Sequence, residues 1–325
     1  MASRVLNKTL TYQIPLKPLT WCAPKAALLL LVSCLSLNAR SQSTASAPSA
    51  TTNSAASSLL ARYNSLASTL ANNVYGRPLF LESTEAGDLV SGNAYAVLDA
   101  PFAAVSTAFS SANTWCDVII LHINTKYCRA VPGSNPPTLR VHVGKKTPQT
   151  LLESFPLEFA LRQVNASASL LVVQLNAENG PMGTSNYRIE LQAAPLEDNK
   201  TFMHLRYSYE YGVAGRLAMQ GYLATIGRGK VGFSTKTPVA ANVKASYVGG
   251  ARGAVERNTM RYYLAIDAYL QALSQPTAQQ VNARLENWFD STERYPVQLR
   301  ETDKTSYMAM KKSEIQRQQA SPSTP

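Results

Sequence analysis

Residues 94–105 read Ala-Tyr-Ala-Val-Leu-Asp-Ala-Pro-Phe-Ala-Ala-Val, and this stretch decides how the rest of the chain folds. Its first half completes an alternating segment over residues 88–98, which predicts a strand. Asp99 and Pro101 are favourable at the start of a helix, and the apolar residues that follow are spaced to share one helical face. The sequence therefore predicts a strand that leads directly into a packed helix, with residues 115–120 continuing the helical layer.

Further strand-like segments follow this helix, with turn residues between them. They are residues 127–131, 138–143, 156–164, 169–175, 186–193 and 201–211. The breaks contain Pro, Gly, Asn and Asp, as in the run from Pro132 to Pro137. Short strands joined by such turns predict a meandering antiparallel sheet. A short strand is also expected earlier, over residues 79–81.

Helical spacing of apolar residues occurs on both sides of the predicted sheet. The expected helices cover residues 57–72, 215–226, 251–273 and 277–290, and the third is the longest. A Gly-rich link, residues 227–233, separates the second helix from the third. Its backbone amides could cradle an anion or a lipid headgroup, or it is a plain turn.

The order of strand, helices, antiparallel strands and long C-terminal helix resembles the START-like helix-grip superfamily. This superfamily includes birch-pollen-allergen-type proteins, polyketide cyclases and lipid-transfer domains. The resemblance is carried by residues 94–105, by the late strand Phe202 to Tyr209, and by the helix at 251–273, and it covers roughly residues 88–273. The chain departs from the pattern between Tyr211 and Gly250, where an extra helix and the Gly-rich link are inserted.

This resemblance implies an α+β fold in which an antiparallel sheet of six to seven strands wraps around a long C-terminal helix. Additional helices are expected before and after that domain. Members of the superfamily mostly bind hydrophobic ligands between the sheet and the long helix, so the resemblance implies the same kind of ligand here.

The N-terminal residues predict export. Four basic residues precede a short apolar run, residues 26–32, which is too short to span a membrane. Cleavage before Cys34 would give a lipidated N-terminus, because residues 31–34 resemble a bacterial lipobox; cleavage after Ala47 is the alternative. We expect an exported bacterial protein that is periplasmic or anchored to the outer membrane, and a lipid anchor would bring it into contact with the membrane surface.

These observations divide the 325-residue chain into six parts. They are a signal peptide (1–33), a flexible tether (34–56), an N-terminal helix and connection (57–87), the helix-grip-like domain (88–273), C-terminal helices (274–310) and a disordered tail (311–325).

Charge and cysteine content limit the possible partners. The net charge is +11, and it falls to +7 without residues 1–33, but no long basic run is present, so we expect no nucleic-acid partner. Cys116 and Cys128 form an even pair in an exported chain, which predicts a disulfide that stabilises by about 3 kcal/mol. The three histidines are not at ligand spacing, so neither a metal nor another cofactor is expected.

Candidate ligand-binding residues gather near the late strand and the long helix. Tyr207 and Tyr209 fall at period two on one strand face, and Arg252 and Glu256 are i,i+4 neighbours. The charged pair either orients a polar head at the mouth of a cavity or forms a solvated salt bridge. With two further tyrosines, the set is Tyr207, Tyr209, Tyr222, Arg252, Glu256 and Tyr263.

No catalytic motif occurs, and His204 in an apolar strand is typical of a core histidine. The sequence thus favours a non-enzymatic binding domain for a hydrophobic or amphiphilic ligand, a lipid among the options. Two alternatives stay open: an envelope structural or interaction protein with a filled core and an exposed apolar patch, and a hydrolase or cyclase that uses the same cavity. The protein partner stays undefined.

Overall fold

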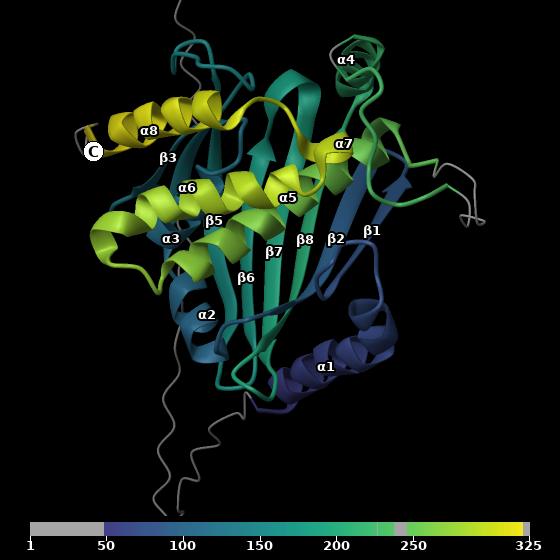
Figure 1. The fold of residues 1–325 in the computed structure, drawn as a ribbon, viewed down its shortest axis with the longest axis vertical. Coiled ribbons are helices and arrows are strands. Elements are labelled where there is room, and N and C mark those ends of the chain that lie inside the picture. The colour runs from purple at the N-terminus through teal and green to yellow at the C-terminus, as the bar shows by residue number, and fades with distance from the viewer. Residues whose placement is uncertain (1–48, 226, 237–245, 321–325) are drawn as a thin grey trace, which may run out of the picture. The chain divides into compact units, whose positions relative to one another are not determined.

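An antiparallel sheet of eight strands forms the centre of the molecule (Figure 1). The structure is a computed structural model that describes residues 49–225, 227–236 and 246–320. The strand order is β1-β2-β8-β7-β6-β5-β4-β3. The strands are β1 (Leu79–Ala86), β2 (Leu89–Leu98), β3 (Thr125–Val131), β4 (Thr138–Val143), β5 (Phe155–Ala166), β6 (Leu171–Asn179), β7 (Thr184–Pro195) and β8 (Thr201–Tyr211).

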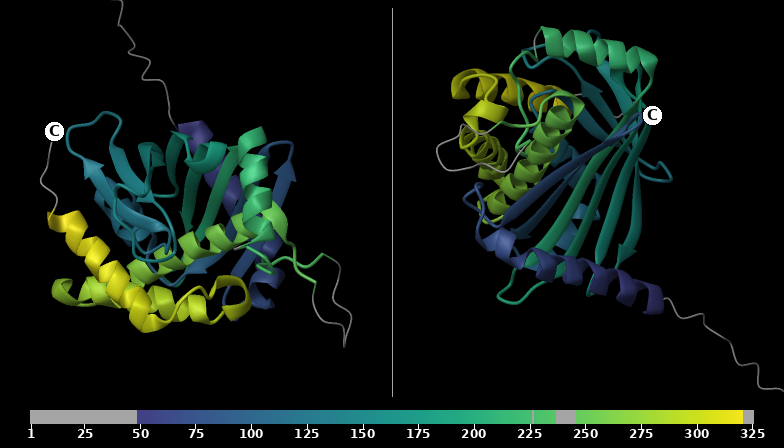
Figure 2. Two further views of the ribbon diagram at one scale, coloured as in Figure 1. Left: turned by 90° about the horizontal axis from the view of Figure 1, so that it is seen from above. Right: turned by 90° about the vertical axis from the view of Figure 1, so that its right-hand side faces the viewer.

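Helices cover the inner face of this sheet (Figures 1 and 2). The helices are α1 (Ser49–Ala71), α2 (Phe102–Phe109), α3 (Ala112–Ile119), α4 (Val213–Ala224), α5 (Gly250–Ala272), α6 (Thr277–Glu293), α7 (Pro296–Leu299) and α8 (Lys304–Ala320), with a short 3₁₀ turn, η1 (Pro181–Gly183). Helix α5, which is as long as α1, packs along β2, β1 and β8, and the helices that follow it add a second layer and reach β3.

Strand alternation places the core on the inner face. On β8, for example, Met203 and Leu205 are buried on the inner face, whereas the next residue, Arg206, lies on the outer face and is exposed. Gly92 lets α5 cross β2 closely, because a Cβ at that position would lie 2.3 Å from the Thr259 Oγ1. The α+β helix-grip architecture expected from the sequence is therefore confirmed, with α2 and α3 inserted between β2 and β3.

The sheet has one strand more than the six to seven that were expected. The segment expected as a short strand at 79–81 extends to Ala86 and forms a hairpin with β2 through a turn at Gly87. Gly87 has φ +60°, a conformation that glycine adopts without strain. The hairpin places β1 at the edge of the sheet, beside the helix-grip strands.

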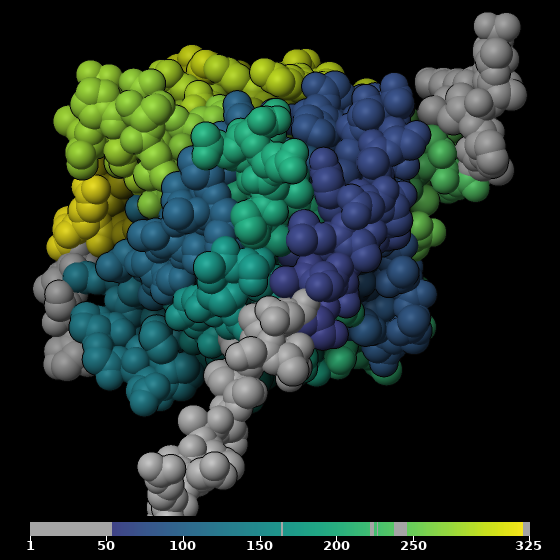
Figure 3. Space-filling view, turned by 90° about the horizontal axis from the view of Figure 1, so that it is seen from below, coloured from purple at the N-terminus to yellow at the C-terminus, as the bar shows by residue number. Residues whose placement is uncertain are grey.

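Helix α1 packs on the outer face of the sheet at one end (Figure 3). Its residues Leu59, Leu66 and Leu70 join Tyr95 and Phe202 in a second apolar cluster. The remaining outer face carries mostly polar side chains. Helix α1 begins at Ser49, so the segment 34–56 expected to be a tether is helical from that residue onward.

The disordered tail expected from residue 311 is wrong for residues 311–320, which form the second half of α8. Its polar composition misled the prediction, because Lys311 and Glu314 are buried against β3. Gln318 of α8 also accepts a hydrogen bond from the Cys128 amide on the edge strand β3, at 3.1 Å. The signal peptide, Cys34 and the alternative cleavage site near Ala47 lie outside the described residues.

The Cys116–Cys128 disulfide is confirmed and joins α3 to β3. Across the described ranges, no helix has the length and apolar character needed to span a membrane.

Candidate functional site

A cluster of tyrosines lies on the inner face, at the end of the sheet where β8 leads into α4. Tyr207 and Tyr209 project from β8, as their period-two spacing predicted, and Tyr187 joins them from β7. The rings of Tyr187 and Tyr209 stack with centroids 5.3 Å apart. Tyr262 of α5 closes the cluster, with its ring 5.3 Å from that of Tyr207. The long helix and the late strand therefore meet through aromatic rings.

The hydroxyl groups of this cluster differ in their partners. Tyr187 shares a 2.8 Å hydrogen bond with Thr184, whereas the hydroxyls of Tyr209 and Tyr262 have no hydrogen-bond partner among the described residues. Burial raises the pKa of Tyr207, Tyr209 and Tyr262. These phenols therefore stay protonated at neutral pH and are suited to donate hydrogen bonds, not to act as bases or nucleophiles.

Arg252 and Glu256 lie together on α5, but they do not form the solvated salt bridge considered above. Glu256 is fully buried, and its carboxylate accepts from the Ser83 hydroxyl at 2.5 Å. The same carboxylate accepts from the amides of Phe233 and Ser234, at 2.6 and 2.9 Å. Arg252 donates to the same Ser83 hydroxyl at 3.1 Å. Glu256 therefore fastens the Gly-rich link to α5, and both side chains tie α5 to Ser83 of β1.

Gly232 in that link is required by close packing. A Cβ there would lie 2.4 Å from the Glu256 carboxylate and 3.0 Å from the Cα of Gly253. In the same link, the Lys230 ammonium pairs with Glu301 at 3.2 Å, and the Val231 carbonyl accepts from Arg257. The link is thus held by the chain's own side chains.

Tyr263 lies apart from the tyrosine cluster. Its hydroxyl accepts from Arg77 at 3.1 Å, and Arg77 also pairs with Asp267 at 3.0 Å. Tyr222 lies in α4, and its side chain is outside the described atoms. Of the six predicted ligand-binding residues, the structure brings together two pairs: Tyr207 with Tyr209, and Arg252 with Glu256.

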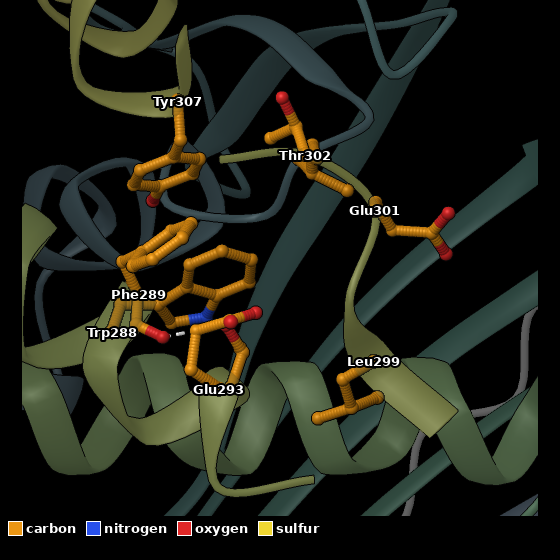
Figure 4. A pocket seen from close by; sticks show the side chains of 9 residues that line it. Trp288, Phe289, Glu293, Leu299, Glu301, Thr302 and Tyr307 are labelled. Atoms are coloured by element: carbon orange, nitrogen blue, oxygen red, sulfur yellow. Dashed lines mark hydrogen bonds between the residues drawn. The ribbon is translucent and has the colours of Figure 1, made fainter. Parts of the chain in front are cut away.

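Two carboxylates act as hubs that the sequence reasoning missed. Glu301, after α7, pairs with Lys146 at 2.7 Å, Arg261 at 2.8 Å and Lys230 at 3.2 Å. These cations outweigh burial and lower the pKa of Glu301. A hollow of about 10 Å³ adjoins it, between Trp288, Phe289 and Tyr307 (Figure 4), and it has room for no more than one water molecule.

The second hub is Glu314 of α8. Its two oxygens pair with Lys126 of β3 at 3.0 Å and with Lys311 at 2.8 Å, and all three side chains are buried. Lys311 also donates to the carbonyls of His122 and Thr125, at 2.8 and 2.6 Å. Burial lowers the pKa of Lys311 to about 8. Sequence pattern gave no signal for this cluster, because Lys126 and Glu314 are far apart in the chain.

The histidines do not assemble a catalytic centre in the described part of the chain. Burial lowers the pKa of His204 to about 4; its ring stacks on Tyr95 at 4.3 Å, and its Nε2 lies 2.9 Å from Asn93. His142 lies 3.0 Å from the Ser154 hydroxyl, but that hydroxyl already donates to the Leu151 carbonyl at 2.6 Å. Ser154 is therefore not activated as a nucleophile.

Two larger hollows stand out in the described region, and neither lies beneath α5. One, of about 130 Å³, lies between α3, α6 and α8, next to the Asp117–Arg284 ion pair. The other, of about 170 Å³, lies on the outer face of the sheet. The inner face under α5 is filled by the tyrosine cluster and by the Gly-rich link that Glu256 holds.

Comparison with known proteins finds likeness in structure alone. No protein-family model matches the chain, and no curated protein sequence is similar to it. Human StAR-related lipid transfer protein 5 is similar in structure, with 7% identity over 69% of this chain and 100% of that one, at a TM-score of 0.34.

The structure of Ara h 8.0201 has 8% identity over 57% of this chain and 99% of that one, with a TM-score of 0.32. Norcoclaurine synthase from Thalictrum flavum, in complex with dopamine and hydroxybenzaldehyde, has 12% identity over 46% and 83%, with a TM-score of 0.30. At these scores, function has to be argued from the residues of this chain.

Proposed function

We propose that this protein is an exported, non-enzymatic binding domain that holds a hydrophobic or amphiphilic ligand, such as a lipid, against the inner face of its sheet. The observation that carries the proposal is the tyrosine cluster of the inner face, where the hydroxyls of buried Tyr209 and partly buried Tyr262 make no hydrogen bond to the described residues. Ligand sites for apolar molecules are mostly apolar surfaces with a few polar groups that orient the ligand.

Exposed apolar side chains at the same end of the sheet support this proposal. Six of the nine most exposed large apolar residues of the described chain lie on the turns and strand ends there, or on α4. They are Leu89, Leu152, Phe155, Met182, Val213 and Leu217. Large apolar patches on soluble domains mark sites of interaction with membranes, ligands or proteins.

Entry of a ligand requires a movement, since the inner face is filled. Helix α4 is the element that moves in this proposal, because Val213 and Leu217 are 79% and 64% exposed and few of its side chains are buried. Tyr207, Tyr209 and Tyr262 then contact the ligand. Arg252 and Glu256 keep the Gly-rich link in place and form one wall of the site.

Export into the bacterial envelope is part of the same proposal. The basic, apolar and small-residue segments of residues 1–33 support a signal peptide. The Cys116–Cys128 disulfide is compatible with an oxidising compartment. Lipidation of Cys34 would hold the domain near a membrane from which an amphiphile is taken.

A second candidate function is an envelope interaction protein without a small ligand. The filled inner face favours it, because the same exposed apolar end would then bind a protein surface. The two candidates differ in what should copurify with the chain: a small amphiphile for the first, and a protein for the second.

Native mass spectrometry with lipid extraction distinguishes them, using protein isolated from the envelope. An amphiphile at about one molecule per chain is expected, and the intact mass also reports the cleavage site and any acyl group on Cys34. A Tyr209→Phe/Tyr262→Phe variant should retain less of it, whereas Tyr127→Phe, on the outer face, should match the wild type. A ligand-free wild-type chain that takes up no added phospholipid would reject the first candidate in favour of the second.

A further inference from the structure

The outer face of the sheet contains a polar hollow of about 170 Å³ that the proposed function does not use. Strand alternation directs Arg206, Ser208 and Glu210 of β8 to this face, opposite to the tyrosine cluster. Helix α1 packs on the other end of the face, against Tyr95 and Phe202. The hollow therefore lies outside the α1 contact, on the opposite side of the sheet from α5.

Small side chains surrounded by long ones create the hollow. Ser91 and Ser208 are direct partners across β2 and β8, and both are buried although they face outward. Arg188 is the partner of Ser208 on β7, and Arg206 is the partner of Glu190. Ser208 lies at the floor of the hollow, and the longer side chains of neighbouring positions rise around it.

The charged side chains around the floor differ in their hydrogen-bond partners. Glu190 accepts hydrogen bonds from Gln174 at 2.7 Å and from Gln192 at 2.6 Å. Glu210 accepts from Asn186 at 2.7 Å. Arg188 and Arg206 have neither an ion pair nor a hydrogen bond to the described residues, even though Glu190 stands opposite Arg206 in register. The hollow thus contains two guanidinium groups without a partner in the described chain, while neutral amides satisfy its two glutamates.

A buried polar atom points to the same conclusion. The side-chain oxygen of Asn176, which lines the hollow, is inaccessible and has no hydrogen-bond partner in the described part of the chain. A buried, unpaired amide oxygen costs about 1–3 kcal/mol, so the polar groups around the hollow are not fully satisfied by the chain itself. Arginine is the side chain best suited to bind carboxylate and phosphate groups, through its planar fork of N–H donors.

We propose that this outer-face hollow binds a small polar molecule that carries a carboxylate or phosphate group. Arg188 and Arg206 hold the oxyanion, and the Ser208 hydroxyl contacts it from the floor. The site is independent of the inner face, so either site could be occupied without the other.

Isothermal titration calorimetry on the full mature chain tests this site with three probes: inorganic phosphate, galacturonate, and vesicles of phosphatidylglycerol compared with phosphatidylcholine. Binding of at least one oxyanion probe is expected. Arg188→Gln and Arg206→Gln should each weaken it by about tenfold or more, the effect of losing one charged hydrogen-bonding group. The probe that binds identifies the source as phosphate, a carboxylate or a lipid headgroup.

Two further variants make the test specific. Arg140→Gln removes the same charge from the outer face of β4, away from the hollow, and should bind like the wild type. Ser208→Val fills the floor and should abolish binding while circular dichroism shows a folded sheet. The proposal is overturned if no probe binds the wild type, or if Arg140→Gln weakens binding as much as Arg206→Gln does.

Discussion

Glu256 and Glu314 are both buried carboxylates on helices that pack against the sheet, yet they are stabilised in different ways. Glu256 is 0% exposed and accepts hydrogen bonds from a serine hydroxyl and two backbone amides. Glu314 is 1% exposed and lies between the ammonium groups of Lys126 and Lys311. One carboxylate is satisfied by neutral donors and the other by two cations.

The difference teaches what each cluster contributes. Neutral donors fix the position of a chain segment, here residues 233 and 234, without bringing a second charge into the interior. A buried group of two cations and one anion loses solvation at every member, and its attraction only partly offsets that loss. We therefore expect Glu256 to govern local order and Glu314 to govern global stability.

Replacing each of the two glutamates with glutamine tests this difference. We expect the larger loss of unfolding free energy at Glu314. Glu314→Gln leaves two buried ammonium groups without a counter-charge, and we expect the free energy of unfolding to fall by about 3–5 kcal/mol. Urea denaturation followed by circular dichroism measures the change.

The matched control removes all three charges at once, as Lys126→Met/Lys311→Met/Glu314→Leu. We expect this variant to lose less stability than Glu314→Gln, because no uncompensated charge remains and the loss is confined to ammonium hydrogen bonds such as those to the carbonyls of Ile123, His122 and Thr125. Equal losses in the single and the triple variant would show that the salt-bridge geometry itself, and not charge balance, supplies the stability.

The alkaline pH dependence of stability sharpens the comparison, since only the Glu314 cluster contains buried lysines. Burial lowers the pKa of Lys311 from 10.5 to about 8 in the folded chain, and it also lowers the pKa of Lys126. Between these two values the unfolded chain binds a proton that folded Lys311 lacks. Stability should therefore rise with pH from about 8, by up to about 1.4 kcal/mol per pH unit for one group.

Above the ordinary tyrosine pKa of 10.0, the buried phenols act in the opposite direction. Burial raises their pKa values in the folded chain, so the unfolded chain loses protons first and stability falls. Urea midpoints across this range should form a maximum, and Lys311→Met should flatten its rising side. If the urea midpoint of Lys311→Met rises with pH as steeply as that of the wild type, another group releases the proton.

Glu256→Gln should lower the free energy of unfolding least, by about 1 kcal/mol. The glutamine oxygen still accepts from the amides of Phe233 and Ser234, and its nitrogen donates to the Ser83 hydroxyl. Hydrogen exchange at Phe233 and Ser234 should nevertheless accelerate, because the charge-assisted hydrogen bonds become weaker. Glu256→Leu serves as the contrast, since it leaves both amides unpaired; exchange as slow as in the wild type would contradict the proposed role.

The fold was predictable because its decisive signals are local. The strand and helix start in residues 94–105 and the alternation of β8 specify which faces are buried, and both appear in the structure as expected. The β1 hairpin was underestimated, because Glu82, Ser83 and Thr84 hide its strand character behind polar side chains. The same kind of error turned part of α8 into an expected disordered tail, since Lys311 and Glu314 are buried by pairing.

The candidate site was less predictable because its contacts are long-range. Period-two spacing placed Tyr207 and Tyr209 correctly on one face, but nothing in the sequence marked Tyr187 as their neighbour, and Tyr262 was only one of several tyrosines nearby in the sequence. The i,i+4 spacing of Arg252 and Glu256 suggested that they would pair with each other. Instead, both bind Ser83, more than 150 residues earlier, and only the folded chain brings that hydroxyl to α5.

The position of α8 has a consequence for association between molecules. Strand β3 is the last strand of an open sheet, and the unpaired backbone groups of such a strand are a template for pairing with another chain. Helix α8 lies over this edge, and its Gln318 occupies the Cys128 amide that would otherwise bind a foreign strand. The C-terminal helix therefore protects this edge against aggregation, and proteolytic loss of residues 304–320 would expose β3 to strand-to-strand pairing with another chain.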